Sequence, residues 1–464
     1  MNARFKFKKT KIICTIGPAS LTKNTIKRMY KKGMNGVRIN TAYGNIDQYQ
    51  QIIDNTRDTA DIPIILDIKG PEIRLKVKEK IQIKKGDEIE VGFSDEEISF
   101  NHDFYDPMRV SDSIYIDNGK IRTQVIKKNN RKLLLAVMND GEISNGKGAN
   151  IPNKHLLVPT LSEKDKEMVD FSNKNNVEFI ALSFTRNAED IQNLKCLPKT
   201  FRSGVIAKIE NFEGLKNVKE ILANSDGIMV ARGDLGVEIE PERVPLIQKR
   251  IIKMCNQEGK IVVTATEMLE SMIYQPIPTR AEVSDIANAI LDGTDAIMLS
   301  GETSVGRHPI EAVSMMSRIA KETDPAVKNQ VEDSKFINTS DTISKAIQRL
   351  CQSMPVDKIV TLTRSGYTAR MISRLKVSPQ IIAVTSEGKI KKQLEFVYNV
   401  YPIQLDYNKE KDRILAIASK LRYMNLLSDN NIVIFTAASR TFESHASNLI
   451  EIHKIEDLLK TQKI

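Results

Sequence analysis

The chain has 464 residues, of which 41% are hydrophobic and 28% charged, with a formal net charge of +10. This composition excludes a disordered chain, and the length excludes a minimal binding module because about three domains are expected at roughly 150 residues each. The sequence has no apolar run near the roughly 18 residues of a membrane helix, no paired-cysteine motif and no tryptophan, which argues against a membrane span, a zinc ribbon and a base-stacking surface.

Short apolar segments recur along the chain, each followed by a helical pattern. Their starts lie 23 to 36 residues apart, except for one gap of 117 residues, and this spacing is typical of strand–helix units in a parallel sheet. Eight such units close into a barrel more readily than they stay open, so an α/β fold with a (β/α)8 TIM barrel is predicted. A doubly wound open sheet is the alternative. The predicted strands are 11–17, 36–40, 62–68, 179–184, 204–210, 227–232, 260–266 and 296–301.

The single long gap marks an insertion after the third strand. There the pattern changes to the alternation of half-buried strands, with turn signals at Asn118–Gly119, Asn129–Asn130 and Asp140–Gly141. We therefore expect a small all-β lid on a barrel loop at the catalytic end. Its predicted strands are 81–83, 88–91, 113–116 and 133–137.

A third region follows a charged linker that begins near residue 328. Predicted strands at 358–363, 381–385, 401–405 and 431–437 alternate with helical segments, which indicates a C-terminal α/β domain. The expected boundaries are 1–70 with 154–325 for the barrel, 71–153 for the lid, and 326–464 for the C-terminal domain.

Polar residues gather at the ends of the predicted barrel strands, where barrel enzymes place their active residues. Lys208 and Glu210 should point the same way because strand residues two apart share a face. Glu210 and Asp234 could hold Mg²⁺, while Arg38 and Lys208 would neutralise a phosphoryl group in transfer. A buried salt bridge is the simpler explanation for any one pair, but so many charges at one rim would be costly without a ligand. The full set is Arg38, Asn40, Asp67, Lys69, Lys208, Glu210, Arg232, Asp234, Thr264, Thr266, Ser300 and Glu302.

The segment 231–236 is a second candidate for ligand binding, through its backbone. Gly233 lets the backbone approach a ligand, and a following helix would aim free N–H groups at a carboxylate or phosphate.

These motifs, in this order, resemble the pyruvate kinase family over nearly the whole chain. The matching segments are TKIICTIGPAS at 10–20, DIKGPEIR at 67–74, AKIEN at 207–211, MVARGDLGVE at 229–238 and LSGET at 299–303. The resemblance implies a barrel domain, an inserted lid and a regulatory C-terminal domain. It also implies phosphoryl transfer from phosphoenolpyruvate to ADP, giving pyruvate and ATP in the last step of glycolysis.

The resemblance also assigns roles to individual residues. Arg38 would bind the phosphate of phosphoenolpyruvate, and Lys208 would stabilise the transferring group and the enolate. Glu210 and Asp234 would hold Mg²⁺ (or Mn²⁺). The backbone at Gly233 and Asp234, with the Thr266 hydroxyl, would hold the substrate carboxylate, and Thr266 would also lie on a proton path to the enolate carbon. The contacts to the ADP phosphates would be Arg74 and Lys147, at the two hinges of the lid.

The family's K⁺ site is expected to be weakened in this chain. Asn40 and Asp67 match its ligands, and Ile68, which stands where threonine is usual, would coordinate through its backbone carbonyl. Ala42, however, replaces the usual serine and supplies no side-chain oxygen. Glu72, by contrast, matches the members that need K⁺. Because one oxygen ligand is missing while the other features are kept, we predict a K⁺ site that is weakened but not lost.

A candidate effector loop lies in the C-terminal domain. Thr363, Ser365, Gly366 and Thr368 follow a strand and open a helix, which predicts a phosphate nest for a phosphorylated effector. A loop without a ligand is the alternative, because 437–441 lacks the glycine-rich sequence that usually closes over a sugar phosphate.

Two other functions stay open. A Mg²⁺-dependent lyase acting on pyruvate-type enolates could use the same rim, although it would have no nucleotide for the lid to cover. A basic nucleic-acid binder would fit the net charge, but basic residues are interleaved with acidic ones and form no stripe. We therefore expect no nucleic-acid or membrane partner, a cytoplasmic location because the first apolar run is too short for a signal peptide, and, from the resemblance, a homotetramer.

Overall fold

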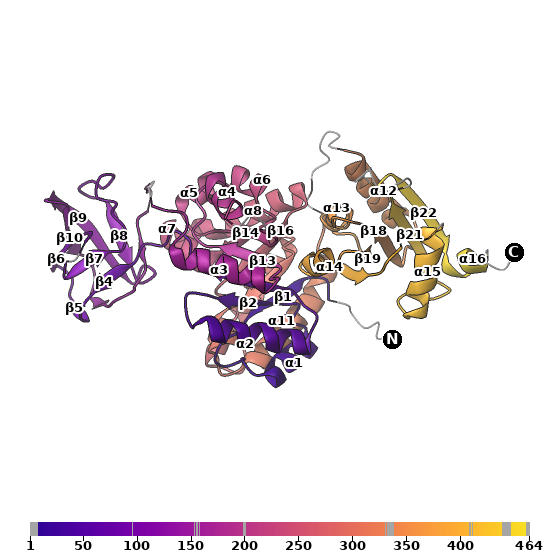
Figure 1. The fold of residues 1–464 in the computed structure, drawn as a ribbon, viewed down its shortest axis with the longest axis horizontal. Helices are drawn as coiled ribbons and strands as arrows, with labels where there is room; N and C mark the ends of the chain where they lie inside the picture. The colour runs from indigo at the N-terminus through magenta and orange to yellow at the C-terminus, as the bar shows by residue number, and fades with distance from the viewer. Residues whose placement is uncertain are drawn as a thin grey trace.

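The computed structural model describes residues 8–94, 96–152, 154, 156, 158–197, 201–329, 331, 338–407, 410, 412–438 and 447–460. Figure 1 shows an elongated molecule with the small β-sheets at one end, a barrel in the middle and the C-terminal sheet at the other end. No helix in these ranges combines the length and apolar character needed to cross a bilayer.

A closed barrel of eight parallel strands forms the centre of the described chain, as predicted, so the open-sheet alternative is wrong. The strands lie in the order β1-β17-β16-β15-β14-β13-β3-β2 and are almost entirely buried. Parallel strands covered on both faces need such continuous apolar runs. Their bounds are β1 Lys11–Thr15, β2 Gly36–Asn40, β3 Ile64–Ile68, β13 Phe179–Leu182, β14 Gly204–Ile209, β15 Gly227–Ala231, β16 Ile261–Ala265 and β17 Ala296–Leu299.

Helices cover the outside of the barrel. Side chains that alternate outward from the strands pack against them in one large apolar core. Capping boxes at Asn45, Ser162 and Thr279 fix the starts of three of these helices. The helices are α1 Lys23–Lys32, α2 Ile46–Thr59, α3 Glu163–Lys174, α4 Ala188–Lys195, α5 Phe212–Lys216, α6 Val218–Asn224, α7 Arg232–Glu238, α8 Val244–Glu258, α9 Arg280–Leu291, α10 Gly301–Ser304 and α11 Pro309–Thr323, with 3₁₀ turns η1 Pro241–Arg243, η2 Glu270–Ile273 and η3 Asp324–Ala326.

The insertion after β3 is all β, as predicted, but it holds more strands than the alternation indicated. Three sheets form, in the strand orders β12-β8-β9-β10-β6, β11-β5 and β4-β7, around a separate apolar core. The turn predicted at Asn129–Asn130 lies one residue later, because Asn130 and Arg131 carry the positive φ angles. The strands are β4 Leu75–Val77, β5 Ile81–Ile83, β6 Glu88–Val91, β7 Ile98–Phe100, β8 Ser113–Ile116, β9 Ile121–Asn129, β10 Lys132–Val137, β11 Gly141–Ile143 and β12 Ala149–Asn150.

The C-terminal region is an α/β sheet in the order β20-β19-β18-β21-β22. Its last strand, which the sequence did not predict, runs antiparallel to β21. The core of the barrel interior continues into this sheet through Phe179 and Phe396, whose rings lie 5.3 Å apart. The elements are α12 Thr339–Ser353, β18 Lys358–Leu362, α13 Tyr367–Ser373, β19 Gln380–Thr385, α14 Gly388–Leu394, β20 Val400–Gln404, α15 Arg413–Tyr423, β21 Ile432–Ala437, β22 Leu449–Lys454 and α16 Ile455–Lys460.

Candidate active site

A polar cleft of about 330 Å³ opens at the carboxyl ends of the barrel strands, under the β-rich insertion. Both the barrel and the insertion contribute charged side chains to its wall. The predicted site residues that line it are Arg38, Asn40, Asp67, Ile68, Lys69, Arg74, Lys147, Lys208, Glu210 and Asp234.

Lys208 lies at the centre of this cleft, on β14, and is 7% exposed. Its Nζ is 2.9 Å from Glu210 Oε1, 3.2 Å from Asp67 Oδ1 and 2.7 Å from Ser183 Oγ. Burial opposes the charge on Lys208, but Asp67 and Glu210 outweigh burial and raise its pKa above the ordinary value. The side chain is therefore a fixed cation at the floor of the cleft.

Arg38 adds a second fixed cation from β2. Its Nε donates to Asp67 Oδ2 at 2.6 Å, and its Nη1 donates to Thr15 Oγ1 at 3.1 Å. Asp67 is itself buried, which favours its neutral form, yet Arg38 and Lys208 together hold its pKa below the ordinary value. Asp67 thus stays charged and orients both cations.

The carboxylates of Glu210 and Asp234 make an anionic counterpart. Burial raises the pKa of Glu210 to about 7, Lys208 opposes this, and the charge of Asp234 adds to it. Burial is also the main cause of the raised pKa of Asp234. Such a strained anionic pair favours a bound cation. No group of three or more His, Cys, Asp or Glu side chains suited to a metal occurs in the part of the chain that the structure describes. A metal held by Glu210 and Asp234 would therefore need further oxygen ligands from outside this pair, such as those of a substrate.

Gly233 and Thr266 lie next to Asp234, but they are not among the residues that line the cleft. The Gly233 N–H donates to Thr266 Oγ1 at 2.8 Å, and that hydroxyl donates to the Ala265 carbonyl at 2.6 Å. Thr266 has a φ of +65°, a conformation that non-glycine residues adopt at a cost of order 1–3 kcal/mol, often at functional sites.

Arg232 supports this strained segment from behind. Its Nη2 donates to the carbonyls of Thr266 and Glu267, at 2.7 and 3.1 Å, and its Nη1 pairs with Asp285 at 2.6 Å. The prediction that Arg232 belongs to the charged rim is therefore wrong.

Other members of the predicted rim also face away from the cleft. Met229 points into the barrel, whereas Ile228 and Val230 pack in the outer core, so the even residues of β15 face outward and Arg232 faces the helices. By the same alternation Thr264 points outward to Thr294. The Glu302 carboxylate accepts the backbone N–H groups of Leu269 and Ser300 in a buried loop.

The two nucleotide candidates lie at the roots of the insertion. Arg74 donates to Glu72 Oε2 at 2.7 Å, and Lys147 pairs with Asp117 at 3.0 Å. Both cations line the cleft, and each is paired with its own carboxylate there, Arg74 with Glu72 and Lys147 with Asp117.

The candidate K⁺ ligands lie at one corner of the cleft, at the ends of β2 and β3. Asn40 Oδ1 accepts the Ala42 N–H at 3.1 Å, and the Ile68 carbonyl accepts the Ser183 N–H at 3.2 Å. The Ala42 methyl lines the cleft where a serine hydroxyl would add an oxygen.

Two residues that the sequence reasoning missed also belong to the cleft. Ser183 bonds to both Lys208 and Asp67, and the Phe184 N–H donates to Glu210 Oε2 at 2.8 Å. Phe184 has a φ of +51°, which turns the chain there. Their position at the end of the predicted fourth strand was the signal, but neither that strand nor the first contributes a residue to the predicted rim.

The C-terminal loop is built largely on its own hydrogen bonds. Thr363 Oγ1 accepts the Gly366 N–H at 3.0 Å, and the hydroxyls of Thr368 and Ser447 lie 2.8 Å apart. Ser365 is exposed. Residues 439–441, in the segment that lacks the glycine-rich sequence, lie outside the described ranges.

Comparison with known proteins identifies the family. Residues 7–313 match the model of the pyruvate kinase barrel domain, and residues 341–453 match that of the pyruvate kinase alpha/beta domain. The chain belongs to the pyruvate kinase family. Pyruvate kinases from Sporosarcina psychrophila and Geobacillus stearothermophilus are each 39% identical to it, over 97% of this chain and 81% of theirs. A pyruvate kinase from Cryptosporidium parvum has a similar structure, with a TM-score of 0.88 and 32% identity over 97% of this chain and 96% of that one.

The chain is accordingly an enzyme, a phosphotransferase with pyruvate kinase function. The family assignment and the closed barrel both agree with the predictions from sequence.

Proposed function

We propose that the cleft transfers the phosphoryl group of phosphoenolpyruvate to ADP, and that Lys208, Glu210 and Asp234 are its centre. The observation that carries this is a buried cation 2.9 Å from one carboxylate of an anionic pair at the active end of the barrel. Phosphoryl transfer needs little covalent chemistry from the protein, because positioning and charge stabilisation supply most of the catalysis.

The two cations take different parts in this proposal. Arg38, held by Asp67 and Thr15, binds the phosphate of phosphoenolpyruvate in a fixed orientation. Lys208 faces the charge that develops on the transferring group and on the enolate oxygen. Preorganised charges of this kind are effective because they need no reorganisation during the reaction.

Glu210 and Asp234 fit a divalent cation, Mg²⁺ or Mn²⁺. Both are hard oxygen donors, both have raised pKa values that a bound cation would relieve, and two carboxylates leave sites for substrate oxygens. When bound, the metal would neutralise negative charge on the substrate. The backbone at Gly233 and Asp234, with the Thr266 hydroxyl, would hold the substrate carboxylate, and Thr266 would lie on the proton path to the enolate carbon.

The insertion acts as a lid over this site, with residues 71–153 moving against a barrel of 1–70 and 154–325 and a C-terminal domain from 326. Arg74 and Lys147 would exchange Glu72 and Asp117 for the phosphates of ADP. Closure would exclude water, which could otherwise intercept the phosphoryl group.

The assay that tests the function measures pyruvate formed from phosphoenolpyruvate, with and without ADP and with a metal chelator. We expect pyruvate only when ADP and a divalent cation are both present. Pyruvate release that ignores ADP would support the alternative, a lyase acting on pyruvate-type enolates.

Potassium dependence is expected to be weak, because Ala42 lacks a side-chain oxygen at the cleft. Activity should be measurable in K⁺-free buffer, and Ala42→Ser should lower the K⁺ concentration for half-activation by about threefold, since one more oxygen ligand strengthens a weak cation site. Titrations with choline chloride as ionic balance measure this. Strict K⁺ dependence that the serine leaves unchanged would contradict it.

The remaining assignments extend the proposal to the whole molecule. The family resemblance favours a cytoplasmic, homotetrameric enzyme of the last step of glycolysis. The loop with Thr363, Ser365, Gly366 and Thr368 is the candidate site for a phosphorylated effector.

A further inference from the structure

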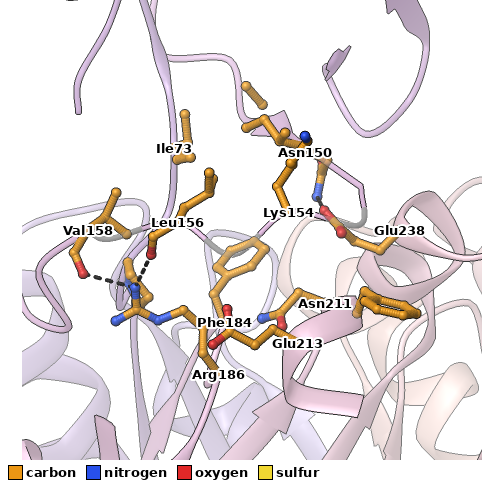
Figure 2. A pocket seen from close by; sticks show the side chains of 14 residues that line it. Ile73, Asn150, Lys154, Leu156, Val158, Phe184, Arg186, Asn211, Glu213 and Glu238 are labelled. Carbon is orange, nitrogen blue, oxygen red and sulfur yellow. Dashed lines mark hydrogen bonds between the residues drawn. The ribbon is translucent and has the colours of Figure 1, made fainter. Parts of the chain in front are cut away.

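A second pocket lies behind the cleft, where the lid joins the barrel (Figure 2). Ile73, Asn150 and Leu156 line it from the lid and its hinges, and Phe184 and Glu238 line it from the barrel. Phe184 also lines the catalytic cleft, so the two spaces border on the same residue. A change in the shape of this pocket would therefore reach Phe184, whose N–H donates to the proposed metal ligand Glu210.

Arg186 fixes the barrel side of the returning hinge. Its Nη1 donates to the carbonyls of Leu156 and Val158, each at 2.9 Å, and both bonds are drawn in Figure 2. Its Nη2 and Nε donate to the two carboxylate oxygens of Asp190, at 2.7 and 3.0 Å. A bidentate pair of this kind orients the guanidinium strongly, so Leu156 and Val158 are tied to the barrel.

Asn150 and Glu238 form a different link, from the lid to helix α7. Asn150 belongs to β12, which pairs with β8 inside the lid sheet. Its Nδ2 donates to Glu238 Oε1 at 2.9 Å, and the Phe212 N–H bonds to the same carboxylate. A second contact lies nearby, since a Cβ on Gly119 of the lid would come within 3.2 Å of Val237. The lid thus rests on α7 at two points.

Helix α7 connects the Asn150–Glu238 hydrogen bond to one of the proposed metal ligands, Asp234. Asp234 and Glu238 are four residues apart on one helix, so they share a face.

We propose that Glu238 is a positioning residue for lid closure: its carboxylate accepts the Asn150 hydrogen bond and sets the lid against α7, so that the lid cations reach the phosphates of ADP beside Asp234. The inference rests on the proposed function, because it takes ADP as the ligand under the lid. Phosphoenolpyruvate, bound within the barrel, should depend on the link much less.

Steady-state kinetics of Asn150→Ala, Glu238→Ala and the double variant test the link. Each single variant should raise the KM for ADP about tenfold, the size expected when a hydrogen bond to a charged group is lost. The KM for phosphoenolpyruvate should stay within about twofold of wild type, and the double variant should be no worse than Glu238→Ala alone, because Asn150→Ala removes a bond that Glu238→Ala has already removed. Glu238→Gln keeps an acceptor for Asn150 and should restore most of the ADP affinity.

Gln82→Ala is the matched control, because Gln82 donates to Glu142 at 2.7 Å entirely within the lid. It should leave both KM values unchanged. An unchanged KM for ADP in Asn150→Ala, or an equal change in Gln82→Ala, would overturn the inference. If Glu238→Ala does not fold, Asn150→Ala tests the same bond from the lid side.

A binding measurement separates this inference from the activity. The chain has no tryptophan, so Phe212→Trp places a single reporter in the pocket wall. ADP with Mg²⁺ should change its emission, and adding Asn150→Ala should shift half-saturation to about tenfold more ADP, as in the kinetics. No emission change, or an unchanged midpoint, would overturn the inference. A wild-type enzyme without ADP-dependent turnover would instead contradict the proposed function.

Discussion

Lys208→Ala should lower turnover by about a thousandfold or more, since removing one preorganised charge or donor from a transition state costs about 10²–10³ in rate and Lys208 faces both the transferring group and the enolate. The fold should persist, because Asp67 keeps its pair with Arg38 and Glu210 keeps the Phe184 N–H. Pyruvate formation at saturating substrates measures the turnover, and thermal unfolding measures the fold.

Lys11→Ala is a matched control for this variant. Lys11 is also a buried lysine on a barrel strand, 3% exposed, but its Nζ donates to the Val400 carbonyl at the opposite end of the barrel. Its loss should lower the unfolding temperature and leave turnover nearly unchanged. Near-normal turnover in Lys208→Ala would mean that Lys208 is only a salt-bridge partner within the barrel.

Glu210→Gln should reduce turnover by about a hundredfold and raise the Mg²⁺ concentration for half-activation by at least about tenfold, because a divalent cation is held by ligand charge as well as by ligand geometry. Glutamine has nearly the same shape and can still accept the Phe184 N–H, so the change removes charge and little else. Magnesium titrations of the activity measure both effects.

Glu178→Gln is the matched control, because it makes the same substitution at a buried glutamate outside the cleft. Glu178 also accepts a backbone N–H, that of Ile64 at 2.9 Å, and pairs with Lys392 at 3.2 Å. Its variant should keep the wild-type response to Mg²⁺. If Glu210→Gln keeps that response too, the assignment of the metal to Glu210 and Asp234 is wrong.

The sequence predicted the barrel and the centre of the site because both depend on simple periodicities. Buried parallel strands need continuous apolar runs at regular spacing, and period-two alternation places Lys208 and Glu210 on one face, where the structure has them 2.9 Å apart. Family motifs then suggested roles that composition alone could not.

One error arose where the period-two alternation was not applied at a strand end. Arg232 continues the outward-facing even positions of β15, so it turns outward to Asp285. The others arose where the chain leaves that alternation. Thr266 has a positive φ, and no alternation rule predicts where its side chain lies. In the lid, β11 pairs with β5 across a long stretch of sequence, and such register is set by tertiary packing.

The most direct test of the central claim follows the phosphorus atom itself. Phosphorus NMR of phosphoenolpyruvate, ADP and Mg²⁺ with the wild-type enzyme should show one ATP for each phosphoenolpyruvate consumed, with no free phosphate, because the closed lid keeps water from the phosphoryl group. Release of inorganic phosphate, or consumption of phosphoenolpyruvate without ATP, would contradict transfer to ADP in this cleft.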